Sequence, residues 1–186
     1  GIEAVETSKK KAAVFIKPYP DQKIFERIEW SSSVAEYCGI DIDSSNIATM
    51  RNLVHLERKS AAQLLRVKQK LNSLGIPFVI KGIFLPQDIE LVKEVRPDVI
   101  FISNHGGRVE TREGSTVSFL KENASVLKSN CNELWIDGGI RTRSHVLAAL
   151  YLGADSVLLG RPFATALCRS GEEGVVNLAK KLTNAL

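Results

Sequence analysis

A histidine and an arginine stand three residues apart in "SNHGGR", residues 103–108, directly after the apolar run "DVIFI". Imidazole changes its charge near neutral pH, so His105 is a candidate general base. Arg108 carries a planar guanidinium that can hold a carboxylate with two hydrogen bonds. Asp43 ends an earlier apolar run, and it would fix the tautomer of His105 and raise its basicity if the two met. The pattern favours proton abstraction from a substrate that carries a carboxylate. The plainer interpretation is a strand that ends in ordinary turn residues.

A lysine closes the apolar run "PFVIK", where an unpaired ammonium would be costly to bury. Lys81 can pair with Asp41 or Asp43, or it can face a cofactor that develops negative charge, and the sequence leaves both interpretations open. His55 and His145 have no companion motif, and we expect them to be ordinary structural hydrogen-bonding residues.

Two glycine-containing turns follow apolar runs late in the chain, "DGGIR" (137–141) and "GRPF" (160–163). Glycine lets backbone N–H groups approach an anion closely, and the N-terminus of the following helix adds partial positive charge. Arg141 and Arg161 can add charge-assisted hydrogen bonds. Either turn alone is weak as a signal, but together they predict a phosphate site, which barrels often build after their last two strands.

Short apolar runs alternate with segments of helical period along the whole chain. The runs are "AVFIK" (13–17), "GIDID" (39–43), "PFVIK" (77–81), "DVIFIS" (98–103), "ELWID" (133–137) and "SVLLG" (156–160). Between them apolar residues recur at helical spacing, as at Ala61, Leu64, Leu65 and Leu71. This alternation predicts parallel strands joined by right-handed crossovers, in either an open doubly wound sheet or a (β/α)8 barrel.

Polar or charged residues end nearly every one of these runs, and this decides between the two architectures. In a parallel α/β protein the carboxyl ends of all strands lie on one face, and a barrel gathers many of them around one mouth. We therefore expect a single domain over residues 1–186, a (β/α)8 TIM barrel. Only six runs are present, whereas a complete barrel typically needs ~250 residues, so the barrel is expected to be incomplete, with about six βα units.

The composition is that of an ordinary globular protein, with 44% apolar and 25% charged residues in 186. The net charge of +4 is dispersed among acidic residues, and no aromatic-basic array suits nucleic acid. No run is long enough to span a membrane and no leader is evident, so we expect no membrane association and a cytoplasmic location. The three cysteines have no CxxC spacing and are expected to be reduced thiols, and no metal site is predicted.

Five stretches together resemble the FMN-dependent α-hydroxy-acid dehydrogenase and oxidase family, which includes glycolate oxidase, lactate oxidase and mandelate dehydrogenase. They are "VIKG" (79–82), "ISNHGGR" (102–108), "IDGGIR" (136–141), "ALYLGADSVLLGRPF" (149–163) and "GEEGV" (171–175). The resemblance extends over essentially the whole chain, and it implies an FMN-binding barrel that oxidises a small 2-hydroxy acid to the 2-oxo acid.

The resemblance also implies a role for each matching residue. His105 would take a proton from substrate, Asp43 would orient it, and Arg108 would bind the substrate carboxylate. Lys81 would lie near flavin N1 and the C2 carbonyl. The remaining cofactor-binding residues would be Ser103 at the flavin, Asp137 at the ribityl chain, and Gly138, Gly139, Arg141, Gly160 and Arg161 at the phosphate.

The chain departs from the family pattern in several places. "KPY" stands where many relatives have Gln-x-Tyr, so Tyr19 is a candidate for substrate binding, with Lys17 beside it. Asp41 stands where many relatives have threonine, and "VETREGST" (109–116) replaces the usual loop after Arg108. The first run looks like the third strand of the family, so the first two strands are expected to be missing.

The missing strands leave alternatives open. Open sheet edges pair readily with other chains, so we expect either a homo-oligomer or a complementing chain that closes the barrel. A catalytically silent flavin- or phosphate-binding partial barrel is the main functional alternative. Type 2 isopentenyl-diphosphate isomerase is another FMN barrel, but the presence of both His105 and Arg108 favours a hydroxy-acid substrate.

Overall fold

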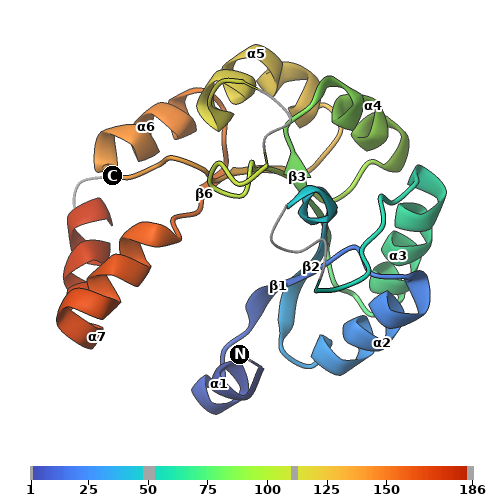
Figure 1. The fold of residues 1–186 in the computed structure, drawn as a ribbon, viewed down its shortest axis with the longest axis horizontal. Helices are drawn as coiled ribbons and strands as arrows, with labels where there is room; N and C mark the ends of the chain where they lie inside the picture. Colours follow the sequence, from blue (N-terminus) through green and yellow to red (C-terminus); the bar gives the residue numbers. More distant parts are fainter. Residues whose placement is uncertain (1, 48–52, 110–112, 184–186) are drawn as a thin grey trace.

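A computed structural model describes residues 2–47, 53–109 and 113–183. Within these residues one parallel sheet contains six strands, and their order in the sheet is their order in the chain. The strands are β1 (Ala12–Ile16), β2 (Ala35–Asp41), β3 (Phe78–Ile83), β4 (Val99–Ile102), β5 (Glu133–Ile136) and β6 (Ser156–Val157). The sheet curves into a half-barrel, which confirms the prediction of an incomplete TIM barrel (Figure 1).

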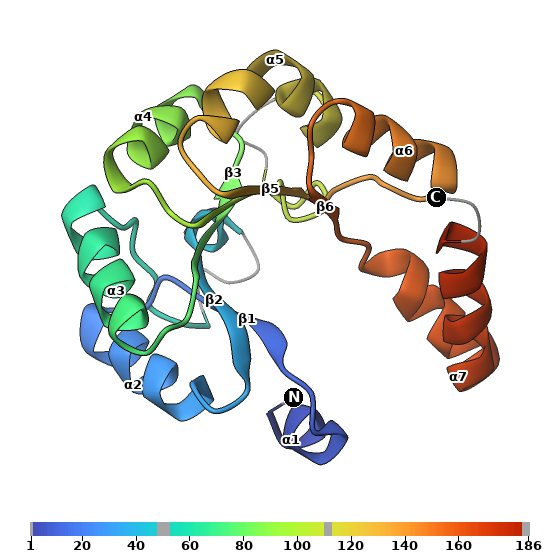
Figure 2. The same cartoon turned by 180° about the vertical axis from the view of Figure 1, so that it is seen from behind.

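Helices cover the convex face of this sheet and form an outer arc, seen from both sides in Figures 1 and 2. The arc consists of α2 (Asp21–Ser31), α3 (Ala61–Ser73), α4 (Pro86–Val95), α5 (Thr116–Lys128) and α6 (Arg143–Tyr151). At its two ends lie α1 (Ile2–Ser8) and α7 (Arg161–Thr183), and α7 is kinked at Ser170 and Gly171. A short 3-10 helix, η1 (Ile42–Asn46), follows β2 directly.

Local sequence signals explain where the helices begin. Ser60 caps α3 by accepting a hydrogen bond from the backbone of Gln63, whose side chain bonds back to Ser60 N. Ser115 caps α5 and Thr142 caps α6 in the same way, with one side-chain oxygen on a backbone N–H of the first turn. The α6 cap matters for function because that helix follows the "DGGIR" turn.

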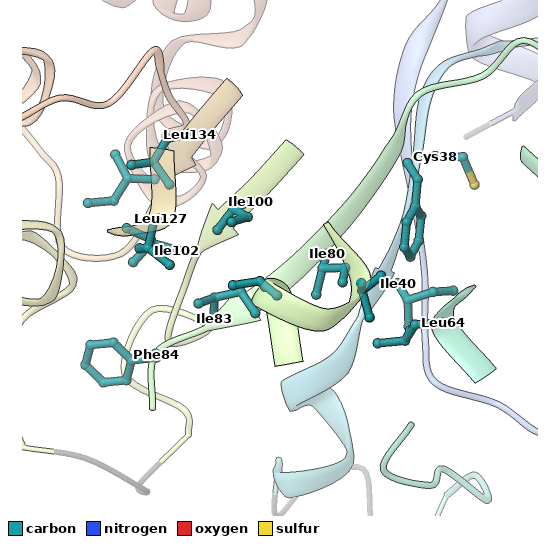
Figure 3. Packing of buried hydrophobic residues seen from close by; sticks show 14 of the residues in the cluster. Cys38, Ile40, Leu64, Ile80, Ile83, Phe84, Ile100, Ile102, Leu127 and Leu134 are labelled. Carbon is teal, nitrogen blue, oxygen red and sulfur yellow. The ribbon is translucent and has the colours of Figure 1, made fainter. Parts of the chain in front are cut away.

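The main hydrophobic core lies between the sheet and the helical arc. Figure 3 shows Ile40, Ile80 and Ile100, which point outward from three neighbouring strands to meet the helices, and each of them is fully buried. Leu64 of α3 and Leu127 of α5 complete this layer and are also fully buried. This core fixes the curvature of the sheet and therefore the position of whatever projects from its other face.

The concave face carries a second, smaller cluster of large side chains. Phe101 packs edge-on against Phe15 at 5.5 Å and against Trp135 at 5.9 Å between ring centroids. Deeper on this face, Tyr37 Oη and Trp135 Nε1 donate hydrogen bonds of 2.9 and 2.8 Å to the two carboxylate oxygens of Glu133. Because side chains alternate along a strand, residues two positions beyond these rings project from the same face nearer the carboxyl ends.

The sheet has two open edges in the part of the chain that the structure describes. β1 pairs only with β2, and β6 pairs only with β5. The opening of the half-barrel lies between α1 and α7 (Figure 2). No helix among the described residues has the length and apolar character needed to cross a membrane.

Candidate active site

Four polar side chains project from the concave face at the carboxyl ends of neighbouring strands. Three of them lie two residues beyond Val79, Phe101 and Trp135 on the concave face, and the fourth lies four residues beyond Tyr37, as strand alternation requires. The four polar residues are Asp41, Lys81, Ser103 and Asp137. The alternation of side chains along each strand and the parallel pairing of the strands bring together residues that are far apart in sequence. The sequence predicts this convergence at the carboxyl ends of the strands.

The "SNHGGR" segment turns sharply over this row. His105 has a φ of +53°, a left-handed conformation that costs a non-glycine residue energy, and the turn continues through Gly106 and Gly107 at +67° and +86°. The buried Ser103 hydroxyl accepts a hydrogen bond of 3.2 Å from the backbone N–H of His105 and so stabilises the turn. This conformation directs the imidazole back toward the strand ends.

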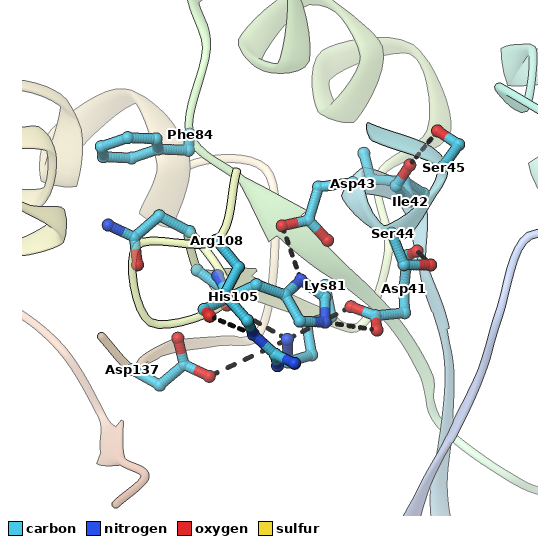
Figure 4. A network of polar contacts seen from close by, with 12 residues as sticks. Asp41, Ile42, Asp43, Ser44, Ser45, Lys81, Phe84, His105, Arg108 and Asp137 are labelled. Carbon is cyan, nitrogen blue, oxygen red and sulfur yellow. Dashed lines mark hydrogen bonds and ion pairs between the residues drawn. The ribbon is translucent and has the colours of Figure 1, made fainter. Parts of the chain in front are cut away.

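The imidazole of His105 lies between two carboxylates, as Figure 4 shows. Nδ1 is 2.8 Å from Asp43 Oδ2, and Nε2 is 2.9 Å from Asp41 Oδ2. The side chains of all three residues are less than 10% exposed. Carboxylates only accept hydrogen bonds, so both ring nitrogens face acceptors, an arrangement that favours the doubly protonated imidazolium.

The charges around His105 shift its pKa and those of both carboxyl groups. Burial alone would lower the pKa of His105, but the hydrogen bonds to Asp41 and Asp43 raise it above 6.5. Burial would raise the pKa of Asp41, but contacts with His105 and Lys81 lower it below 3.8. Burial dominates for Asp43 and raises its pKa, against the opposing influence of His105. The carboxyl group of Asp41 is therefore the more acidic of the two.

Lys81 connects this group to the neighbouring strands. Its ammonium donates to Asp41 Oδ1 at 3.2 Å and to Ser103 Oγ at 3.1 Å, and it lies 3.8 Å from Asp137 Oδ2. The ammonium also lies 5.2 Å from the ring centroid of Phe101. Of the two interpretations that the sequence left open, pairing with Asp41 is present in the structure, and Lys81 also lines the cavity described next.

A cavity of about 300 Å³ opens beside Lys81 and His105. Its wall includes both glycine turns, and its lining contains Asp41, Lys81, His105, Gly106, Arg108, Asp137, Gly138, Gly139, Ile140, Arg141, Leu158, Leu159, Gly160 and Arg161. Helix α6 begins at Arg143 after one turn, and α7 begins at Arg161 after the other. The cavity thus lies beside two helix N-termini and is lined by three guanidinium groups, those of Arg108, Arg141 and Arg161, which together favour an anion.

Hydrogen bonds lock the two turns to the rest of the site. Arg161 Nη2 donates to the carbonyl oxygen of Gly106 at 2.7 Å, which ties the start of α7 to the "SNHGGR" turn. Thr116 Oγ1 donates to the carbonyl oxygens of Asp137 and Gly138 at 2.6 and 3.0 Å. These contacts give the anion side of the cavity a defined backbone shape.

Asp137 contributes an unsatisfied group to this cavity. Its Oδ1 is buried and has no hydrogen-bond partner, and burial raises the pKa of its carboxyl group. A buried acceptor of this kind is costly unless a donor reaches it. A ligand hydroxyl group would supply such a donor.

Arg108 also belongs to the cavity, whereas Tyr19 does not. Arg108 is exposed, and its Nε donates to the carbonyl oxygen of His105 at 3.0 Å. Tyr19 lies at a different cavity near β1, where the ammonium of Lys23 is 4.3 Å from its ring centroid. Its role in substrate binding stays a prediction. Part of the divergent loop after Arg108, at 110–112, lies outside the described residues.

Sequence reasoning missed two residues that shape this site. Thr116 was treated as part of a divergent loop, and only the structure shows that it holds the "DGGIR" turn. Gly82 follows Lys81, and a Cβ there would lie 2.5 Å from Asp43 Oδ1, so the absence of a side chain leaves room for that carboxylate. The "KG" pair was the available signal, because a glycine inside a strand pattern often marks close approach of another group.

Comparisons with known proteins agree with this geometry. The sequence model of the FMN-dependent dehydrogenase family matches residues 8–186. A 2-hydroxyacid oxidase 2 from Rattus norvegicus is 38% identical over 111 residues, which are 60% of this chain and 31% of that enzyme. An L-lactate dehydrogenase from Yersinia pestis (strain Pestoides F) is 45% identical over 102 residues, which are 55% of this chain and 26% of that enzyme.

Solved structures give the same result for the fold. A mandelate oxidase with (S)-2-phenylpropionate has a TM-score of 0.76 at 25% identity, and the match covers 91% of this chain and 55% of the other. A mandelate oxidase variant with a monooxide FMN adduct has a TM-score of 0.75 at 25% identity, with the same coverage. The chain therefore spans about half the length of these structural relatives. The family match over nearly the whole chain confirms the resemblance seen in the sequence: the chain belongs to the FMN-dependent dehydrogenase family.

Proposed function

We propose that this chain carries the catalytic half of an enzyme that oxidises a small 2-hydroxy acid to the 2-oxo acid with FMN as its cofactor. The observation that carries the proposal is one cavity lined by Lys81, His105 and Arg108 on one side and by the two glycine turns on the other. The family match and the hydroxy-acid enzymes among the relatives support the same reaction class. The cytoplasmic location expected from the sequence stays a prediction.

The residues of the cavity fit a phosphorylated cofactor such as FMN. Gly138, Gly139 and Gly160 leave backbone N–H groups approachable, and Arg141 and Arg161 supply charge for a phosphate. The unpartnered Oδ1 of Asp137 would accept a hydrogen bond from a ribityl hydroxyl. Lys81 lines the cavity beside His105, so its ammonium would meet the flavin ring. Ser103 is fully buried and is not among the lining residues, and it accepts a hydrogen bond from Lys81; its contact with the flavin stays a prediction.

The chemistry divides between the cofactor and the chain. FMN, when bound, supplies the two-electron acceptor. Arg108 would hold the substrate carboxylate with its guanidinium, and His105 would accept a proton from the substrate at Nε2. Asp43 holds Nδ1 and stabilises the imidazolium that results. Lys81 would supply positive charge to stabilise the negative charge that the flavin gains on reduction.

Titration of FMN into the purified 186-residue chain tests the anion side of the proposal. Loss of charge-assisted hydrogen bonds in Arg161→Ala is expected to weaken FMN binding by about 10- to 100-fold, measured by quenching of flavin fluorescence. Arg169→Ala is the matched control, because Arg169 lies on the same helix, is exposed and does not line this cavity. Equal affinities of the two variants, or no binding by the parent chain at high micromolar FMN, would refute the assignment.

A catalytically silent flavin binder is the second candidate. Two observations favour it: the sheet has open edges, and Nε2 of His105 is occupied by Asp41 in the site as it stands. A silent binder would show the absorbance of bound flavin without bleaching when L-lactate or glycolate is added under anaerobic conditions. Bleaching by either acid would select the enzyme.

We also propose that the open edges of β1 and β6 are covered by protein in the active form, either by a complementing chain or by a second copy of this one. The exposed Trp30 and the cavity of about 400 Å³ beside β1 lie near one of these edges. Sedimentation velocity over a dilution series is expected to show concentration-dependent association of the isolated chain. A monomer at every concentration would exclude self-association and leave the complementing chain.

A further inference from the structure

Asp41 is the member of the site that the proposed reaction does not use. Its side chain is 9% exposed, and its two oxygens face three cationic or proton-carrying groups. Oδ1 accepts from Lys81 at 3.2 Å, and Oδ2 lies 2.9 Å from His105 Nε2 and 3.8 Å from Lys17 Nζ. A buried carboxylate with this many partners is firmly held.

The position of Asp41 matters because His105 has only one nitrogen to offer a substrate. Asp43 occupies Nδ1, so a proton from substrate can arrive only at Nε2. Asp41 covers that nitrogen and also engages the ammonium of Lys81. A 2-hydroxy acid cannot pass a proton to Nε2 of His105 while Asp41 contacts that nitrogen.

We propose that Asp41 blocks Nε2 of His105, the nitrogen that would accept the proton, when no ligand is bound. A ligand that carries a carboxylate must displace Asp41 before His105 can accept a proton. Asp41 thus acts through His105, and its carboxylate weakens the binding of a ligand that carries a carboxylate. The part of this inference that concerns the substrate rests on the proposed function, whereas the contact between Asp41 and His105 does not.

The charged groups around His105 explain why a ligand must displace the Asp41 side chain from Nε2, and which group the displaced carboxylate can contact. Carboxylates approach from β2, η1 and β5, and cations come from the segment after β1, from β3 and from the turn after β4. These groups are Asp41, Asp43 and Asp137, and Lys17, Lys81 and Arg108. A ligand carboxylate beside Asp41 would add a like charge in a buried place. Lys17 is 30% exposed and lies next to Asp41, so it offers a partner toward the open side.

A side-chain NMR titration tests the contact directly in the 186-residue chain without any ligand. Asp41→Asn removes a charge 2.9 Å from Nε2, so the pKa of His105 is expected to fall. Asp43→Asn should also lower it, since Asp43 faces the other nitrogen. The His105 resonances are identified from their loss in His105→Gln, and amide spectra verify that each variant is folded. An unchanged pKa in Asp41→Asn would overturn the proposal.

Binding of L-lactate separates the two carboxylates. Near neutral pH, Asp41→Asn is expected to bind lactate about tenfold more tightly than the parent, because no buried charge has to be displaced. Asp41→Thr should behave alike, whereas Asp43→Asn should show no gain because it leaves the carboxylate of Asp41 at Nε2. Unchanged or weaker binding in both Asp41 variants would refute displacement. Absence of lactate binding in every protein would instead contradict the proposed function, while the NMR titration still reports on the contact.

Discussion

Replacement of His105 by Gln is expected to leave FMN bound and to slow its reduction by a 2-hydroxy acid about 10²- to 10⁴-fold, since the variant loses its proton acceptor. The measurement is the anaerobic bleaching of flavin absorbance after mixing with L-lactate or glycolate. His55→Gln is the matched control, because His55 lies in an exposed loop and lines none of the cavities described above. Reduction by His105→Gln at the parent rate would remove His105 as the base.

The same histidine should make the rate depend on pH. A base must be neutral to accept a proton, and contacts with two carboxylates raise the pKa of His105 above 6.5. The rate is therefore expected to rise with pH through that raised pKa. The free energy of unfolding should change in the opposite direction. The stabilisation from protonated His105 is fully present below the pKa that His105 has in the unfolded chain, and it is lost as pH rises through the pKa of His105 in the folded protein.

Gly82→Ala is expected to lower the free energy of unfolding by about 2–5 kcal/mol, which combines backbone strain with overpacking. Gly82 has a φ of +101°, and an added Cβ would lie 2.5 Å from Asp43 Oδ1 and 2.9 Å from Asp43 Cβ. For a chain of this size the loss corresponds to roughly 4–20 °C in Tm by thermal unfolding. The same clash would push Asp43 away from His105.

Gly75→Ala provides the control for backbone strain alone. Gly75 ends α3 with a φ of +69°, and an added Cβ would meet no atom within 4 Å. Its cost is expected to be about 1 kcal/mol, because only the left-handed conformation is penalised. Equal losses in the two variants would show that contact with Asp43 contributes nothing at Gly82.

The alternation of strands and helices was predictable from the sequence, but the strand ends were not. The run at 39–43 was expected to be a strand as far as Asp43, whereas β2 is Ala35–Asp41 and Asp43 lies in η1. This difference has a physical cause: Asp43 must leave the strand line to reach Nδ1 of His105. The last run was expected over 156–160, yet β6 pairs only at Ser156–Val157, since its outer edge has no neighbour among the described residues.

The site was predictable to the extent that it depends on strand ends. Lys81, His105 and Arg161 line one cavity because parallel strands place their carboxyl ends together. The contact of Asp41 with Nε2 could not be predicted from the sequence, because it depends on the left-handed backbone conformation of His105. Thr116 was missed for a similar reason, since its carbonyl partners are 21 and 22 residues away.

The order of strands in the sheet has a consequence for how the site is assembled. Each strand pairs with the next one in the chain, so the residues of the site are distributed along the sheet in the order of the sequence. The residues around His105 come from β2, η1, β3 and the turn after β4, whereas the two phosphate-side turns follow β5 and β6. An anionic cofactor held by these turns would therefore stabilise the β5–β6 end of the sheet, and its release would favour local unfolding at that end.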